Sequence, residues 1–148
     1  MLEAALRYAG CHTRSILEVR TYLARRGASA EETSCAIAEC QARNLLDDRA
    51  CARLWADHWA RQGYAWAAIH AKLTARGLDA VARDAAIPAD AAADDAARAR
   101  TLIGSRRAQG DTGRARVRAA RRLAGKGFDP DLIAQLLEES FGSSDVPS

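Results

Sequence analysis

The sequence predicts an all-α protein, built from three tandem repeats of three helices each that stack into an elongated, curved array. Two observations carry this prediction. Aromatic residues make up only 5% of the 148 residues and runs of β-branched residues are absent, which argues against strands. The same helix ending also recurs at a fixed spacing of 50 residues, as Leu23-Ala-Arg-Arg-Gly27, Leu73-Thr-Ala-Arg-Gly77 and Leu123-Ala-Gly-Lys-Gly127. Such self-similarity indicates copies of one supersecondary unit, each unable to bury its apolar face alone.

The three glycines mark where the repeated helices end. A basic last turn followed by glycine is typical of a helix that terminates in the left-handed conformation, which glycine adopts without steric cost. We therefore expect positive φ at Gly27, Gly77 and Gly127. The helices that follow are expected to begin from side-chain caps, at Ser29, Asp79 and Asp129.

Apolar periodicity and these start and stop signals predict nine helices, near residues 2–9, 14–26, 30–42, 48–61, 65–76, 80–88, 90–108, 114–126 and 130–141. They form repeat 1 (residues 1–46), repeat 2 (residues 47–89) and repeat 3 (residues 90–142), and a disordered polar tail is expected over residues 143–148. The period of 50 also makes three further residues equivalent, which we expect to cap the middle helix of each repeat: Thr13, Gly63 and Gly113.

Composition argues against several classes of protein. No segment approaches the roughly 20 apolar residues of a membrane span, and the first residues lack the uninterrupted apolar core of a signal peptide, so we expect a cytoplasmic protein without membrane contact. The four cysteines form no C-x-x-C pair and the three histidines are scattered, so the ligand spacing of a zinc site is missing. We therefore expect no metal and no cofactor, and cysteines that behave as small hydrophobic residues.

The chain also lacks the residue patterns of an enzyme. No Ser–His–Asp or Cys–His arrangement follows from the spacing, and no glycine-rich phosphate loop follows a strand. Asp47 and Asp48 are adjacent carboxylates, but at the start of a helix they are better explained as an N-cap and a first-turn charge. We therefore expect a binding protein and not an enzyme.

Positive charge is concentrated between Arg98 and Lys126. Ten basic residues and one acid, Asp111, give this segment a net charge of +9, against +3 for the whole chain. Because Asp111 is nearly the only acid within reach along the sequence, the repulsion is expected to lack local neutralisation. Four of these bases have the spacing i, i+4, i+7 and i+8 and are therefore expected to form a stripe along one face of a helix: Arg114, Arg118, Arg121 and Arg122. On the opposite side of that helix we expect Val117, Ala120 and Ala124.

Arginine stays charged and binds phosphates or carboxylates with its planar fork, so the stripe indicates a contact for phosphates or for an acidic protein surface. The alternative is a solvated helix face. Arg116 aligns with the apparent core positions Ile16 and Trp66, so either that site is open to water or the Arg stem packs there and its charged end leaves the core. The candidate contact residues are Arg106, Arg107, Arg114, Arg118, Arg121, Arg122 and Lys126, with Arg25, Arg26 and Arg76 as secondary candidates.

Several short motifs occur in an order that resembles one known family, the RecX family of bacterial RecA regulators. They cover nearly the whole chain, and Cys51 stands where the family has an aromatic residue. The motifs are Ala5-Leu6-Arg7-Tyr8 with Arg14-Ser15, Asn44-Leu45-Leu46-Asp47-Asp48 with Ala50 and Ala52, Arg61-Gln62-Gly63, Ile69-x-x-Lys72-Leu73-x-x-x-Gly77, and Lys126-Gly127-Phe128 with Ile133.

The resemblance implies a curved stack of three three-helix repeats and a non-enzymatic, monomeric protein. It also implies partners, namely RecA and the RecA–single-stranded DNA filament, whose recombinase and co-protease activities the protein would limit in DNA repair and the SOS response. Direct contact with DNA is left open by the residues. The alternative is a stand-alone helical nucleic-acid-binding protein that acts without RecA, for which the arginine cluster is the main support.

Overall fold

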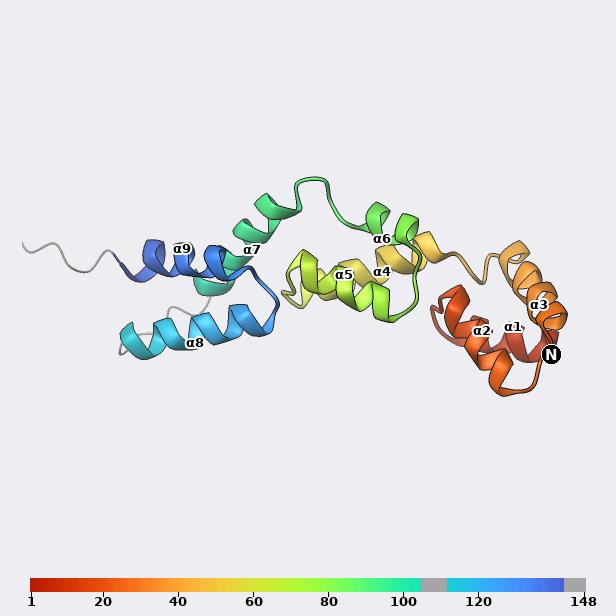
Figure 1. The fold of residues 1–148 in the computed structure, drawn as a ribbon. Coiled ribbons are helices and arrows are strands. Elements are labelled where there is room, and N and C mark those ends of the chain that lie inside the picture. Colours follow the sequence, from red (N-terminus) through yellow and green to blue (C-terminus); the bar gives the residue numbers. More distant parts are fainter. Residues whose placement is uncertain (105–111, 143–148) are drawn as a thin grey trace, which may run out of the picture. The chain divides into compact units, whose positions relative to one another are not determined.

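The computed structural model describes residues 1–104 and 112–142, and this part of the chain folds into nine α-helices without a strand. The expected all-α class is therefore confirmed (Figure 1). The helices are α1 (Leu2–Cys11), α2 (Ile16–Arg25), α3 (Ala30–Ala42), α4 (Asp48–Arg61), α5 (Trp66–Ala75), α6 (Ala80–Ala86), α7 (Ala91–Gly104), α8 (Thr112–Gly125) and α9 (Pro130–Phe141). Residues 105–108, expected as the end of the seventh helix, and the expected tail lie outside the described residues.

The chain divides into two compact units. Unit 1 comprises Met1–His58 and His70–Ile87, and unit 2 comprises Trp59–Ile69 and Pro88–Ser148. Helices α4 and α5 of the second repeat contribute residues to both units. Each unit therefore contains one junction between consecutive repeats, whereas the repeat boundaries themselves stay a sequence-based prediction.

Glycines end the helices as expected. The φ angles of Gly27, Gly77 and Gly127 are +79°, +75° and +85°. At the end of α2, the Gly27 amide donates to the Ala24 carbonyl and the Ala28 amide donates to the Leu23 carbonyl, so two carbonyls of the last turn are satisfied.

The expected caps of the middle helices are wrong. Gly63 has a φ of +86° and ends α4, because its own amide and that of Tyr64 donate back into the last turn of that helix. The cap of α2 is Ser15 and not Thr13, since the Ser15 hydroxyl accepts from the Glu18 amide and the Glu18 carboxylate accepts from the Ser15 amide. Gly113 lies inside α8.

Other side-chain caps are confirmed. Ser29 and Glu32 form a reciprocal capping box at α3, and Asp79 and Asp129 accept amide hydrogens at the starts of α6 and α9. The Asp47 carboxylate accepts from two amides of the first turn of α4, so Asp47 is the expected N-cap. Helix α6 is shorter than expected, because Ile87 precedes Pro88 and is extended, with a ψ of 129°.

Unit 1 has a core rich in small side chains, where α1, α2 and α3 pack together (Figure 1). Alanine at these positions allows close approach of the helix backbones. Cys40 is completely buried in this core, and burial raises the pKa of its thiol, so it behaves as the expected small hydrophobic residue. The buried residues are Ala5, Ala9, Val19, Leu23, Ala36, Ile37, Cys40 and Leu46.

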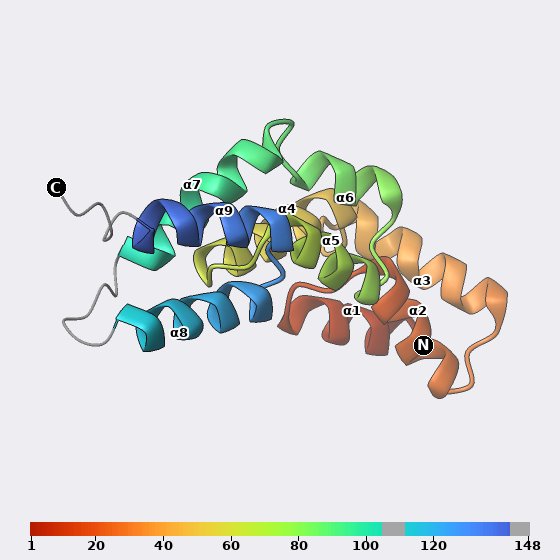
Figure 2. The ribbon, with the colours of Figure 1, turned by 60° about the vertical axis from the view of Figure 1, so that its left-hand side comes forward.

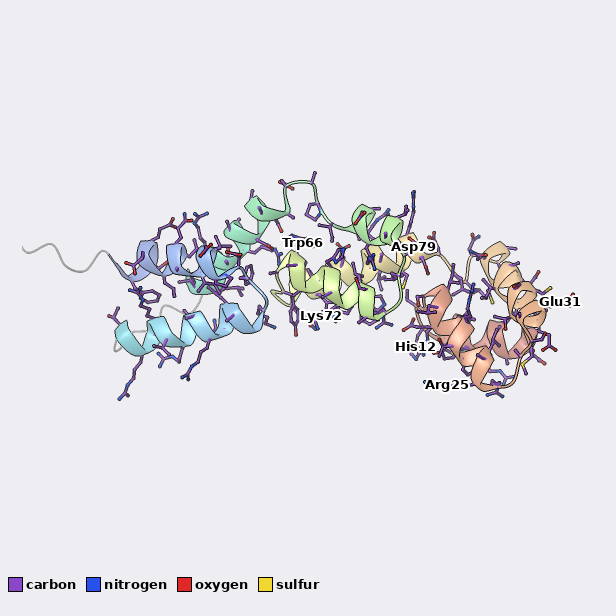
Figure 3. The ribbon with its side chains drawn as sticks, in the orientation of Figure 1. His12, Arg25, Glu31, Trp66, Lys72 and Asp79 are labelled. Carbon is purple, nitrogen blue, oxygen red and sulfur yellow. The ribbon has the colours of Figure 1, made fainter. Side chains whose placement is uncertain are left out.

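Unit 2 has a core of larger side chains, where α9 packs on α7 and α8 (Figure 2). Its buried residues are Ala65, Ala99, Ile103, Leu123, Phe128, Ile133, Leu136 and Leu137. Of the tryptophans, Trp66 at the start of α5 is buried (Figure 3), while Trp55 and Trp59 are half-buried.

The junction of repeats 1 and 2, within unit 1, joins the start of α2 to residues of the second repeat. The Ser15 hydroxyl donates to the Arg76 carbonyl over 2.8 Å, and the Ile16 amide donates to the Asp48 carboxylate over 2.9 Å. The Arg76 guanidinium lies 3.8 Å above the Trp55 ring and pairs with the Glu18 carboxylate at 3.0 Å. Burial raises the pKa of Asp48 although the Ile16 amide stabilises its charged form.

The junction of repeats 2 and 3, within unit 2, uses residues 65, 66 and 126, which lie 50 positions after residues 15, 16 and 76, but its carboxylates come from other positions. The Ala65 amide donates to the Lys126 carbonyl over 2.9 Å, and the Trp66 amide donates to the Asp95 carboxylate over 3.0 Å. The Trp66 indole donates to the Asp94 carboxylate over 2.6 Å. This hydrogen bond lowers the pKa of Asp94, whereas burial raises that of Asp95.

Candidate functional site

Three of the candidate arginines share one exposed face of α8. Arg114, Arg118 and Arg121 line a shallow depression of about 400 Å³ together with Gly113 and Val117. We call Arg114, Val117, Arg118 and Arg121 the α8 basic face. The candidates Arg106 and Arg107 lie outside the described residues.

The expected placement of Val117 is wrong. Val117 is 49% exposed and lies among the arginines, not behind them. The reason is the helical period: residue 117 is three positions after Arg114 and four before Arg121, so the three share one side of the helix. Ala124 is exposed as well, and the buried side of α8 is centred on Leu123.

Arg122 and Lys126 do not belong to this face. The Arg122 guanidinium donates to the Leu102 carbonyl of α7 over 3.4 Å, and its side chain is half-buried. The Lys126 amine lies 4.2 Å above the Tyr64 ring. Both residues therefore hold parts of unit 2 together, in addition to any contact with a partner.

The remaining described bases of the segment are neutralised by acids, those of Arg98 on its own helix α7 and those of Arg100 and Arg116 on α9, so the expected lack of neutralisation is wrong for them. Arg98 pairs with Asp94 and Asp95 at 2.8 Å each and donates to the Tyr64 carbonyl over 2.5 Å. Arg100 pairs with Glu139 of α9 at 3.3 Å, and hydrogen bonds from Gln135 and then Arg100 lower the pKa of Glu139.

Arg116 follows the second of its two alternatives. Its side chain is half-buried at the position equivalent to Ile16 and Trp66, and its guanidinium reaches the Glu138 carboxylate of α9. By contrast, the described residues form no ion pair with Arg118 or Arg121. Folding thus separates the basic segment into paired arginines and a small exposed face, which the sequence spacing alone does not show.

The secondary candidates lie in unit 1. Arg25 and Arg26, at the end of α2, are both exposed, and Arg25 (labelled in Figure 3) lines a groove of about 350 Å³ with Tyr8, Leu17 and Tyr22. Arg76 differs, because its side chain is only 23% exposed and is held by Trp55 and Glu18.

Sequence reasoning missed a column of aromatic and cationic side chains beside this groove. The rings of Tyr8 and Tyr22 stack with their centroids 4.0 Å apart, Arg14 lies 4.4 Å above Tyr8, and Arg26 lies 5.2 Å above Tyr22. Nothing in the spacing of the two tyrosines along the chain indicates the contact, since they come from different helices.

The described residues offer little for other chemistry. Over residues 1–104 and 112–142, no group of three or more histidine, cysteine, aspartate or glutamate side chains is arranged to hold a metal ion. All four cysteines are free thiols. No helix in this part of the chain is long and apolar enough to cross a membrane.

Comparison with known proteins gives similar structures but no similar sequences. No protein-family model and no curated protein matches the chain. The crystal structure of RecX from Lactobacillus salivarius matches with a TM-score of 0.74 and 20% sequence identity, over 93% of this chain and 92% of that one. The chain has the RecX fold. A crystal structure described as regulatory protein RecX also matches, with a TM-score of 0.67 and 18% identity, over 91% of this chain and 68% of that one.

The match confirms the fold that the motifs implied. In the first comparison the matching part runs over nearly the full length of both chains. At this level of identity the likeness concerns the fold, and the roles of individual residues are a matter for proposal and test.

Proposed function

We propose that this protein is a RecX-family regulator that binds RecA and the RecA–single-stranded DNA filament and lowers RecA activity in DNA repair and the SOS response. The RecX fold over nearly the whole chain is the observation that carries the proposal. Regulation by binding requires no catalytic group, so the protein is proposed to act as a non-enzymatic, cytoplasmic monomer.

The α8 basic face is the proposed contact with the filament. Arg118 and Arg121 are exposed and form no ion pair among the described residues, whereas Arg98, Arg100 and Arg116 are paired. A charged side chain without a partner keeps its full attraction for an acidic surface or a phosphate. Arg25 and Arg26 of unit 1 are the next candidates.

The deciding experiment is ATP hydrolysis by RecA on circular single-stranded DNA, with and without this protein. We expect hydrolysis to slow at substoichiometric amounts of the protein, because a regulator bound to a filament affects many RecA subunits. If the rate of ATP hydrolysis stayed unchanged even with as much of this protein as RecA, the proposal would be wrong.

A charge reversal tests the contact. Arg118→Glu with Arg121→Glu should weaken filament binding while the melting temperature stays close to wild type, because both side chains are exposed. The matched control is Arg7→Glu with Arg53→Glu, which changes the net charge equally at exposed positions of unit 1. If both double variants weaken binding equally, only the net charge matters and the α8 basic face has no special role.

Direct binding to nucleic acid without RecA is the second candidate function, and the exposed arginines of α8 favour it. In that case the protein alone should bind an oligo-dT strand. The affinity should fall steeply with salt, and the reversal of Arg118 and Arg121 should reduce the salt slope by about one for each arginine that contacts a phosphate.

A further inference from the structure

The α8 basic face includes one exposed apolar side chain. Val117 is 49% exposed, and it is flanked by Arg114 three residues before it, Arg118 directly after it and Arg121 four residues after it. Gly113 also lines this depression, so a partner backbone can approach the valine closely. The exposed valine is therefore accessible beside the three arginines.

The composition of α8 differs from that of a phosphate-binding helix. Side chains that contact DNA phosphates include lysine, serine, threonine, asparagine and glutamine as well as arginine. From Gly113 to Gly125 the helix contains only arginine, alanine, valine, leucine and glycine. An apolar side chain gains little against a hydrated phosphate backbone, whereas an apolar centre with arginine around it is typical of protein–protein contacts.

We propose that the α8 basic face binds an acidic amphipathic segment of a partner protein. One apolar side chain of that segment packs on Val117, and carboxylates one turn before and one turn after it pair with Arg114 on one side and with Arg118 and Arg121 on the other. Arginine forks bind carboxylates through two parallel hydrogen bonds. Arg114 and Arg121 are separated by about 10 Å along the helix axis, which matches the spacing of two acids two turns apart on a partner helix.

Two binding partners are used in the test. DNA-free RecA is one of them, and only its use rests on the proposed function. The other is a short helical peptide with one leucine and with glutamates one turn before and one turn after the leucine. A second peptide carries alanine in place of leucine, so the two peptides have the same charge. Oligo-dT is the phosphate probe. The protein variants are Val117→Ala and, as matched control, Val81→Ala, because Val81 is a 60% exposed valine on α6.

We expect Val117→Ala to weaken binding of the leucine peptide by about threefold to tenfold, since half a valine side chain loses its apolar contact. Val81→Ala should leave this affinity unchanged. The alanine peptide should bind wild type and Val117→Ala equally. The leucine-to-alanine change in the peptide and Val117→Ala in the protein then form a double-mutant cycle, whose coupling should equal the threefold to tenfold loss of affinity for the leucine peptide. Alanine is a strong helix former, so Val117→Ala keeps α8 intact.

Two results would overturn the inference. One is a leucine peptide that binds Val117→Ala as tightly as wild type. The other is a protein that binds oligo-dT but not the peptide, and whose oligo-dT binding is lost when Arg118 and Arg121 are reversed to glutamate. The α8 basic face would then be a phosphate contact. Failure of the proposed function is a different result: RecA hydrolysis stays unchanged while the peptide still binds at Val117. If instead the protein slows ATP hydrolysis by RecA but Val117→Ala binds DNA-free RecA as tightly as wild type does, the proposed regulatory function stands and a contact between Val117 and RecA is excluded.

Discussion

The two repeat junctions connect equivalent positions but use different donor groups, the Ser15 hydroxyl in unit 1 and the Ala65 amide in unit 2. In unit 1, residues 15 and 16 at the start of α2 bond to the Arg76 carbonyl and the Asp48 carboxylate. In unit 2, residues 65 and 66 bond to the Lys126 carbonyl and the Asp95 carboxylate. Residues 65, 66 and 126 lie 50 positions after residues 15, 16 and 76. The two carboxylates do not follow this period, because Asp48 and Asp95 come from different positions of α4 and α7.

The cation at the two junctions also comes from different elements. Arg76, which follows α5, lies over Trp55 in unit 1, whereas Arg98 of α7 lies 5.1 Å from the Trp66 ring in unit 2. The lesson is that the free amides at a helix start and the free carbonyls at a helix end determine where a partner is needed. Which side chain supplies that partner varies from one junction to the next.

The largest effect is expected for the glycines that differ in their surroundings. A Cβ atom on Gly127 would lie 2.6 Å from the Ala68 Cβ, whereas one on Gly27 would meet open space. Gly27→Ala should cost about 1–2 kcal/mol for the left-handed conformation alone, and Gly127→Ala about 2–5 kcal/mol because overpacking adds to it. Gly77→Ala should cost at least as much as Gly127→Ala, since a Cβ there would lie 2.8 Å from the Leu17 Cβ, which is attached directly to the backbone of α2. Urea unfolding measures the three values, and equal costs for Gly27 and Gly127 would contradict the close approach at the unit 2 junction.

A smaller effect is expected for the two junction arginines. Arg98→Ala should cost about 2–3 kcal/mol, because it removes two partly buried ion pairs and the hydrogen bond to the Tyr64 carbonyl, although both carboxylates keep a hydrogen bond from Trp66. Arg76→Ala should cost about 1–2 kcal/mol, since it removes one ion pair and one ring contact. The control is Arg100→Ala, whose exposed ion pair is expected to contribute at most about 1 kcal/mol. A larger cost at Arg76 than at Arg98 would reverse the proposed difference between the junctions.

The pH dependence of two junction carboxylates should have opposite signs. The folded-state pKa of Asp48 is raised above its usual 3.8 by burial, so its contribution to stability is complete below pH 3.8 and is lost as pH rises through the folded-state pKa. Asp48→Asn keeps an oxygen for the Ile16 amide and should therefore stabilise the protein slightly at pH 7, but not in acid. The pKa of Asp94 is lowered, so its contribution is present above 3.8 and is lost as pH falls through the folded-state pKa. Asp94→Asn should consequently destabilise at pH 7 and less in acid. Melting temperatures of both variants and of wild type, at pH 7 and in acid, test this prediction. If the two variants shifted the melting temperature at pH 7 in the same direction, the opposite pKa shifts of Asp48 and Asp94 would be contradicted.

The smallest effect is expected in thiol reactivity, which reports on unit 1 because all four cysteines belong to it. Burial raises the pKa of Cys51 to about 11, so alkylation at pH 8 should modify the exposed Cys11 and Cys35 quickly and Cys51 slowly. Arg76→Ala should accelerate alkylation of Cys51 more than Arg98→Ala does, because Arg76 and Cys51 lie in the same junction. Mass spectrometry of the digested protein measures each rate. Equal acceleration by both variants would show that the two junctions open together.

Much of the fold follows from local signals. The left-handed glycines, the caps at Ser29, Asp79 and Asp129, and the starts of α3, α4, α6 and α9 match the expectations, because each depends on a few neighbouring residues. The cap of α2 was expected at Thr13 because the period of 50 aligned it with Gly63. The structure shows that Gly63 instead ends the preceding helix, so the alignment compared residues with different roles.

The candidate site was predicted only in part. Helical spacing placed Arg114, Arg118, Arg121 and Arg122 on one side of a helix. The structure confirms this for the first three, but Arg122 is turned toward Leu102 of α7 and the prediction is wrong for it. The prediction also did not show that Val117 shares that side, although the same period contains this information. The partners of Arg100 and Arg116 were not predictable from spacing along the segment, because Glu139 and Glu138 come from α9, more than 20 residues further along the chain. The partners of Arg98 lie only three and four residues before it on α7, just outside the segment.

By itself, the sequence determined the helices, their ends and the period at which they repeat. These features depend on backbone conformation and on hydrogen bonds within a few residues, so local composition suffices to specify them. Only the tertiary structure decided which charges remain available to a partner. An ion pair between α8 and α9 or between α7 and α9 depends on how the helices pack, and packing brings together residues that no short motif connects. Arg118 and Arg121 remain exposed on α8, and among the described residues no acid pairs with them.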